Sequence, residues 1–307
     1  MRFTAIILLC VSAGMHAGWN FLGKTSAQSI RAYGVALLSG LLILSPLSLF
    51  RFPYFYHSPP EVYLIALGAG LFQALYFSAL LGAYTKGDLS VAYPLARTLP
   101  VLLVLGISLL LGRAEQISVL AMMGMLLVAG SAFFLPSKRG ERISLSSYIN
   151  ASNGYALIAA MGTTGYSLLD DAALKIFRDA SGPVAELGLL EISLLYLFFE
   201  ALSAFILFYP IASLVLPTER TARKRNGNSH KSFGASVLMG GMIYLTYSLV
   251  LLSLAYVDDV SYTVAFRQLS LPLAALLGIF ILKEKGNWVR ISAVSLMTTG
   301  LILVALA

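Results

Sequence analysis

The chain has few charged residues, one cysteine and three histidines. Only 11% of its 307 residues are charged, whereas a soluble domain carries about 25%. Cys10, the single cysteine, excludes an internal disulfide and a cysteine-based metal cluster. The histidines form no metal-binding motif, because His57 and His230 fall in predicted loops, far along the chain from His16. We therefore expect neither a metal nor a cofactor.

Long apolar runs are what the chain has instead. It is 58% hydrophobic, with a mean hydropathy of +0.83, and its apolar residues come in runs of about twenty, the length that crosses a bilayer. Because a backbone inside lipid must satisfy its own hydrogen bonds, these runs predict helices and an all-α polytopic membrane protein. The ten predicted spans are 3–23, 31–50, 62–84, 88–112, 117–135, 153–175, 186–214, 233–256, 259–282 and 288–306.

Polar, turn-rich stretches separate these spans, such as "PSKRGER" at 136–142 and "PTERTARKRNGNSHK" at 217–231. The first run could instead be a signal peptide, but it has no clear cleavage site and matches the later runs in length. Prolines at 94, 100 and 272 are expected to interrupt their helices.

Two parts of the chain resemble two later parts. The stretch "AYTKGDLSVAYPLARTLP" at 83–100 is similar to "AYVDDVSYTVAFRQLSLP" at 255–272, and "HAGWNFL" at 16–22 loosely matches "TTGYSLL" at 163–169. A unit of five spans ends on the opposite side of the membrane, so a second copy enters upside down. We predict two inverted five-helix repeats, 1–136 and 153–307, joined by a linker at 137–152, around a central cavity. Chance similarity between apolar segments is the alternative.

The loops differ strongly in basic charge. Those on the side of the termini hold five Lys and Arg residues, and the opposite loops hold fourteen. The positive-inside rule then places the basic loops in the cytoplasm and both termini outside an inner (cell) membrane. The net charge of +7 reflects loops facing anionic lipid, and we expect no nucleic-acid partner.

Two arginines lie deep in predicted spans. Arg97 is nine residues into its span and Arg267 eight or nine into its own, which puts each about 13 Å from a helix start, near the membrane midplane. Guanidinium groups suit carboxylate and phosphate, so both could bind an anionic substrate. Alternatively, each arginine could pin helices together by pairing with a buried carboxylate. The candidate carboxylates are Glu191, Glu200, Asp170 and Asp171.

Aromatic and polar side chains accompany the arginines. On the first span, helical spacing puts His16, Trp19 and Asn20 on one face, and Gly14 and Gly18 on another that predicts close packing. Mid-span clusters occur at Gln73, Tyr76 and Phe77, and at Tyr244, Thr246, Tyr247 and Ser248. The predicted substrate-binding residues are His16, Trp19, Asn20, Tyr76, Tyr93, Arg97, Tyr166, Tyr244, Tyr247, Thr263 and Arg267. His16 is also the candidate for proton coupling, since imidazole titrates near neutrality.

With "HAGWNFLGK" at 16–24, "AYTKGDLSVAYPLARTLPVL" at 83–102, "GRAE" at 112–115 and their partners at 255–285, the chain resembles the drug/metabolite transporter superfamily, EamA type. The resemblance implies ten helices in two inverted repeats, a cavity lined by helices 1, 3, 4, 6, 8 and 9, and export or exchange of small metabolites. Basic residues in helices 4 and 9 resemble those of organophosphate-translocating relatives. Two features depart from the family pattern: the termini predicted to lie outside, and the absence of an acidic coupling residue from the first helix.

The expected function is secondary, ATP-independent transport of a small polar metabolite with an anionic group, by alternating access. A second interpretation is export of amino acids or other neutral or zwitterionic solutes, with the arginines structural. A non-transporting receptor or scaffold is a third. A lipid-modifying enzyme would need a convergent acid/base or metal constellation, which the polar residues do not offer. The sequence does not distinguish a monomer from a homodimer.

Overall fold

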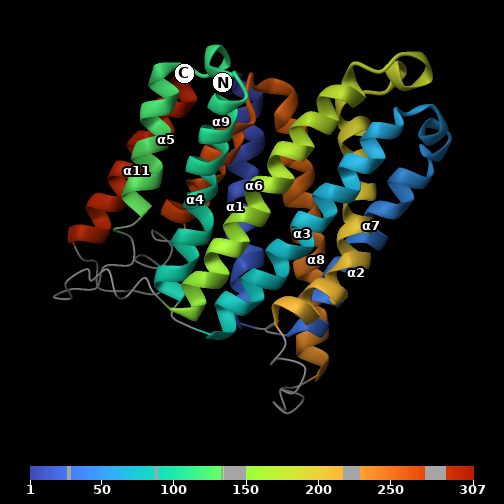
Figure 1. The fold of residues 1–307 in the computed structure, drawn as a ribbon. Coiled ribbons are helices and arrows are strands. Elements are labelled where there is room, and N and C mark those ends of the chain that lie inside the picture. The colour runs from blue at the N-terminus through green and yellow to red at the C-terminus, as the bar shows by residue number, and fades with distance from the viewer. Residues whose placement is uncertain (26–28, 87–88, 133, 135–149, 217–228, 274–287) are drawn as a thin grey trace.

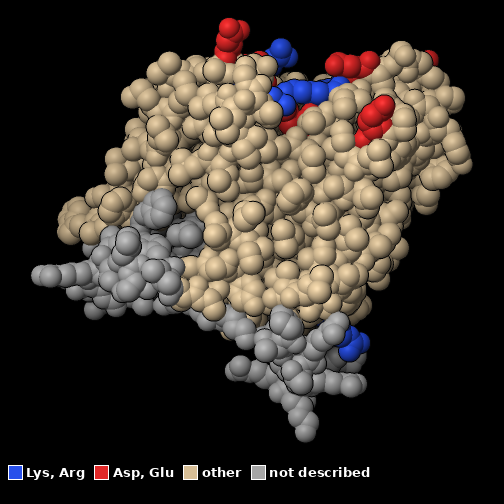
Figure 2. Space-filling view, viewed as in Figure 1, with Lys and Arg blue, Asp and Glu red and all other residues tan. Residues whose placement is uncertain are grey.

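The protein is a bundle of helices in the computed structural model, which describes residues 1–25, 29–86, 89–132, 134, 150–216, 229–273 and 288–307 (Figure 1). The described residues contain no strand, which confirms the all-α prediction. Four helical segments among them are long and apolar enough to cross a membrane: Phe3–Asn20, Pro60–Thr85, Leu189–Val215 and Phe233–Tyr256. Charged side chains gather at the end that carries both termini (Figure 2). These features suit a membrane protein.

Each main helix of the described residues overlaps one of the predicted spans. They are α1 Phe3–Thr25, α2 Ile30–Leu49, α3 Pro60–Lys86, α4 Leu89–Leu110, α5 Val119–Ala132, α6 Ala151–Arg178, α7 Leu189–Val215, α8 Ser229–Ser253, α9 Val260–Phe266 and α11 Trp288–Leu306. Short 3-10 turns complete the described structure: η1 Phe52–His57, η2 Ala114–Gln116, η4 Gly182–Glu186, η6 Leu254–Tyr256 and η7 Arg267–Leu269.

Polar side chains start three of these helices. Ser29 accepts a hydrogen bond from the amide of Ala32 at the start of α2, and Asn150 accepts one from Asn153 at the start of α6. Asp259 does the same for the Ser261 amide at the start of α9. Each oxygen satisfies an amide that has no partner within its own helix, which fixes where the helix begins.

The ninth predicted span differs from the structure. Instead of running unbroken from 259, α9 ends at Phe266 and the chain forms the 3-10 turn η7 before helical conformation resumes at Ser270. Pro272 has no amide hydrogen to donate to the preceding turn, which loosens the helix there. The expectation that Pro94 and Pro100 also interrupt a helix was wrong, since α4 continues through both. A membrane helix can accommodate a proline where its surroundings satisfy the freed carbonyl.

Helices from the two predicted repeats pack on one another. Helix α3 packs on α6 and α7, α1 and α2 pack on α8, and α5 packs on α11. Each pair joins a helix of 1–136 to one of 153–307, so the two segments share a single core. Most of the predicted linker, at 137–149, lies outside the described residues.

Glycines allow the closest helix crossings. A Cβ on Gly124 of α5 would lie 2.6 Å from the Gly300 carbonyl oxygen of α11, and a Cβ on Gly300 would lie 2.7 Å from that of Gly124. The predicted close-packing pair on α1 is only half right. Gly18 packs against Met242, whereas a Cβ on Gly14 would meet nothing within 4 Å.

Candidate functional site

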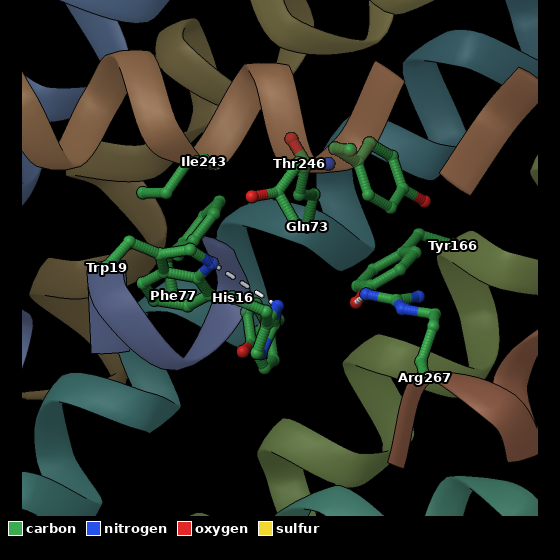
Figure 3. A pocket seen from close by; sticks show the side chains of 10 residues that line it. His16, Trp19, Gln73, Phe77, Tyr166, Ile243, Thr246 and Arg267 are labelled. Atoms are coloured by element: carbon green, nitrogen blue, oxygen red, sulfur yellow. Dashed lines mark hydrogen bonds between the residues drawn. The ribbon is translucent and has the colours of Figure 1, made fainter. Parts of the chain in front are cut away.

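A small cavity lies between α1, α3, α6, α8 and η7 (Figure 3). Its free volume is about 20 Å³, which is room for about one water molecule. Six predicted binding residues line it, together with four others. The lining residues are His16, Trp19, Gln73, Tyr76, Phe77, Tyr166, Ile243, Thr246, Tyr247 and Arg267. Most lie near the middle of their helices, so the cavity is far from both ends of the bundle.

Arg97 lies beside the cavity and joins the two halves of the chain. Its Nη1 lies 2.8 Å from Nε2 of His16, and its Nη2 donates to the Arg267 carbonyl oxygen at 2.8 Å and to the Ser270 hydroxyl at 2.9 Å. The 3-10 turn at Arg267 presents that carbonyl to Arg97. Arg97 is only 5% exposed, and its Nε has no hydrogen-bond partner. Among the described residues, every acceptor around this guanidinium is therefore uncharged.

Arg267 projects from η7 toward Tyr166 (Figure 3). Its guanidinium carbon lies 5.9 Å from the centre of the Tyr166 ring and 5.5 Å from that of the Tyr247 ring, within cation–π range. Its Nη2 donates a long, 3.4 Å hydrogen bond to the Tyr166 hydroxyl. The side chain is 6% exposed. Among the described residues, aromatic rings and no ion-paired carboxylate lie against this cation.

The carboxylates considered as helix-pinning partners contact other groups. Within the described part of the chain, none of them lies in ion-pair contact with Arg97 or Arg267. Glu191 pairs with Arg51, and Asp171 pairs with Arg113 and Lys175. Glu200 accepts a hydrogen bond from Gln73, and Asp170 accepts hydrogen bonds from Tyr196 and Tyr247. Among the residues described, the two buried arginines therefore do not hold helices together through ion pairs.

His16 faces a hydrogen-bond donor at each ring nitrogen. Trp19 directs its indole N–H at Nδ1 from 3.2 Å, and Arg97 directs a guanidinium N–H at Nε2 from 2.8 Å. A neutral imidazole has one bare nitrogen, so it can accept only one of these bonds. A doubly protonated ring could accept neither. This geometry suits a neutral His16 that accepts from Arg97, the shorter and charge-assisted contact.

Three predicted residues lie away from the cavity. Asn20 bonds within the bundle, donating to the His16 carbonyl oxygen at 2.8 Å and accepting from Tyr84 at 2.7 Å. Tyr244 packs its ring over Gly40 of α2, because it lies about 100° around α8 from the lining residue Ile243. Thr263 contacts Ser253 at 3.5 Å. The Tyr93 side chain lies outside the described part of the structure.

The comparisons with known proteins identify the fold but no family. No family model matches the chain, and no curated protein matches it. Among the solved structures that match, one described only as "Crystal structure of protein" has a TM-score of 0.67 and 16% sequence identity. The similarity covers 100% of this chain and 98% of that chain. At this identity the likeness establishes a shared fold alone.

Proposed function

We propose that the chain is a secondary transporter of the drug/metabolite transporter superfamily, EamA type, which carries a small organic anion across the cytoplasmic membrane. In this proposal it is not an enzyme and needs no cofactor. One observation carries the proposal: Arg97 and Arg267 place two buried guanidinium groups beside a cavity, and neither has a carboxylate in ion-pair contact among the described residues. A buried guanidinium that is not ion-paired keeps N–H donors available, so an anion entering between the two would gain charge-assisted hydrogen bonds.

The packing supports ten helices arranged as two inverted repeats. In such repeats α1 corresponds to α6, α2 to α7 and α3 to α8. Under this correspondence the packed pair α1–α8 becomes α6–α3, and α2–α8 becomes α7–α3, and both of these pairs are also packed. The α5–α11 pair maps onto itself. Glycines follow the same correspondence: Gly18 of α1 packs against Met242 of α8, and Gly165 of α6 packs against Phe72 of α3. Such pairing is expected of repeats related by a pseudo-two-fold axis.

The small cavity volume fits a closed, empty stage of alternating access. At about 20 Å³ the cavity holds no metabolite, so binding requires helices to move apart. The 3-10 turn at Arg267 gives α9 a place to bend at the binding site. An anion could there replace the uncharged acceptors that now surround Arg97.

A thermal-shift screen of the purified protein tests binding. The probes are inorganic phosphate, methylphosphonate, glycerol 3-phosphate, pyruvate and alanine. A ligand at a hundred times its Kd stabilises the folded state by about 2.7 kcal/mol. We expect the anions to raise the melting temperature, whereas a response to alanine alone would favour the amino-acid exporter.

Flux in proteoliposomes tests transport. We expect Arg97→Gln and Arg267→Gln to abolish uptake of the responding anion. Arg51→Gln should leave uptake unchanged, because Arg51 lies in an exposed turn at the bundle end and pairs there with Glu191. Unchanged uptake by both interior variants would contradict the anion site. Binding without flux would favour the receptor.

The membrane orientation belongs to the same proposal. The even number of spans agrees with termini at one end of the bundle (Figure 1). We propose that this end faces outward and that the basic loops face the cytoplasm. The basic clusters at 138–142, 220–225 and 283–285 lie outside the described residues. The double variant Cys10→Ser, Arg2→Cys should react with an impermeant maleimide from outside the cell.

A further inference from the structure

Two carboxyl groups lie directly behind the wall of the cavity. Asp170 of α6 is 1% exposed and Glu200 of α7 is 0% exposed. Each contacts a side chain that lines the cavity: Gln73 donates to Oε1 of Glu200 at 2.8 Å, and the Tyr247 hydroxyl donates to Oδ2 of Asp170. One side chain therefore separates each carboxyl from the cavity.

Of the buried carboxyls that the structure describes, Glu200 has the fewest hydrogen-bond and ion-pair partners. Asp170 accepts hydrogen bonds at both oxygens, including one from Tyr196 at 2.8 Å, and Asp171 has two cationic partners. Among the residues that the structure describes, Glu200 accepts one hydrogen bond, from an uncharged amide, and its Oε2 has no partner. Oε1 of Gln73, buried beside it, has none either. A charged carboxylate is costly in such surroundings, whereas a protonated carboxyl is tolerated.

The charged and titratable surroundings of these two groups are shared. Helix α3 places the uncharged Gln73 against Glu200. Tyr33 of α2 stacks on Phe208, which lies about two turns along α7 from Glu200. The groups that interact electrostatically with Glu200 are Asp170, Tyr196, Tyr244, Tyr247 and Arg267. Those that act on Asp170 are Tyr196, Tyr247, Asp171, Glu200 and Arg267. Arg113, beyond the end of α4, pairs with the adjacent Asp171.

Charge balance links these carboxyls to the arginines. In a low-dielectric interior, two guanidinium groups and two carboxylates are neutral together, and an entering anion adds an uncompensated negative charge. A proton on a carboxylate restores the balance. Binding of the anion and binding of the proton therefore favour each other.

We propose that Glu200, with Asp170 as its acidic neighbour, binds a proton that is cotransported with the anionic substrate. The proposal rests on the anion transport proposed above. A proton from water on one side adds to Oε2 of Glu200 when the anion binds between Arg97 and Arg267. The same O–H bond breaks when the anion leaves, which returns the proton to water on the other side. No other bond changes.

Infrared spectroscopy tests the proton site without any substrate. A protonated carboxyl in apolar surroundings gives a carbonyl stretching band that a carboxylate lacks. In the full-length purified protein without anion, we expect this band to appear as the pH falls from 9 to 5, since the empty site binds the proton only when protons are abundant, and we expect Glu200→Gln to remove it. The matched control is Glu191→Gln on the same helix, since Glu191 lies in the first turn and pairs with Arg51. Absence of the band from the wild-type protein at all pH values from 5 to 9 would overturn the proposal, and this measurement needs no variant to fold.

Proteoliposomes with a pH-sensitive dye in the lumen test the coupling, with glycerol 3-phosphate and pyruvate as anion probes. A gradient of one pH unit should drive about tenfold accumulation of a monoanion cotransported with one proton. We expect Glu200→Gln to keep exchange between labelled and unlabelled anion but to lose this accumulation and the lumenal pH change. Wild-type flux without a pH change would overturn proton coupling alone. Absence of flux for both probes, with the infrared band present, would overturn anion transport but not the protonated carboxyl.

Discussion

The crossing of α3 and α6 offers a sharp test, because Gly162 lies against the backbone of the other helix. A Cβ on Gly162 would lie 2.8 Å from the Phe72 carbonyl oxygen and 2.9 Å from the Tyr76 amide nitrogen. Ordinary contact begins at 3.4 Å, so α3 would have to retreat by about 0.6 Å. Overpacking of this kind costs about 1–3 kcal/mol. Alanine in a helix gains about 1 kcal/mol over glycine, which offsets part of that cost.

Gly154 provides the matched control on the same helix, since a Cβ there would meet nothing within 4 Å. Gly154→Ala should therefore stabilise the protein by up to about 1 kcal/mol. We expect Gly162→Ala to be less stable than Gly154→Ala by about 1–3 kcal/mol. Thermal unfolding of both variants in one detergent measures this difference. Because Tyr76 lines the cavity, Gly162→Ala should also reduce anion-induced stabilisation. Equal melting temperatures would refute the tight α3–α6 crossing.

Three further substitutions test the ion pairs and the histidine. Arg113→Ala should destabilise the fold by about 2 kcal/mol, because Arg113 bonds to the buried Asp171 at 2.9 Å, whereas Arg51→Ala should cost less than about 1 kcal/mol at its exposed pair. Equal losses in chemical unfolding would contradict this difference in burial. His16→Gln keeps an acceptor for Arg97, so the pH dependence of anion uptake should survive it; a flattened pH profile would make His16 the proton-coupling group instead.

The positions of the helices could be predicted from the sequence, because the length of the apolar runs determines them. Runs of about twenty apolar residues locate helices because a lipid-spanning backbone has no other way to satisfy its hydrogen bonds. The same signal could not identify the 3-10 turn at Arg267, since that turn depends on local bonds. There the Gln268 side chain donates to the Val264 carbonyl oxygen at 2.9 Å, and the Arg267 carbonyl oxygen accepts from Arg97 on a distant helix.

The residues of the candidate site that could be predicted are polar ones in the middle of an apolar run. Arg97, Arg267 and His16 stand out because polar groups deep in an apolar run must face the interior. Rotation around each helix was harder to predict. Periodicity put Asn20 on the face of His16, but its amide bonds to the His16 carbonyl one turn back, and Ile243 rather than Tyr244 lines the cavity. Ile243 carries no polar signal that could have distinguished it from its neighbours.

The partners of Asp170 and Glu200 could not be predicted from residue types alone. Asp170 and Glu200 were visible in the sequence as candidate partners for the arginines, since opposite charges in an apolar interior attract. In the structure, Tyr166 and Tyr247 lie against Arg267, Tyr247 also bonds to Asp170, and neither carboxyl reaches a guanidinium. Cations and acids are thus held close enough to influence one another and too far apart to pair. In the proposed transport, this separation would leave Arg97 and Arg267 available to an anion and Glu200 available to a proton, which a direct ion pair would have prevented.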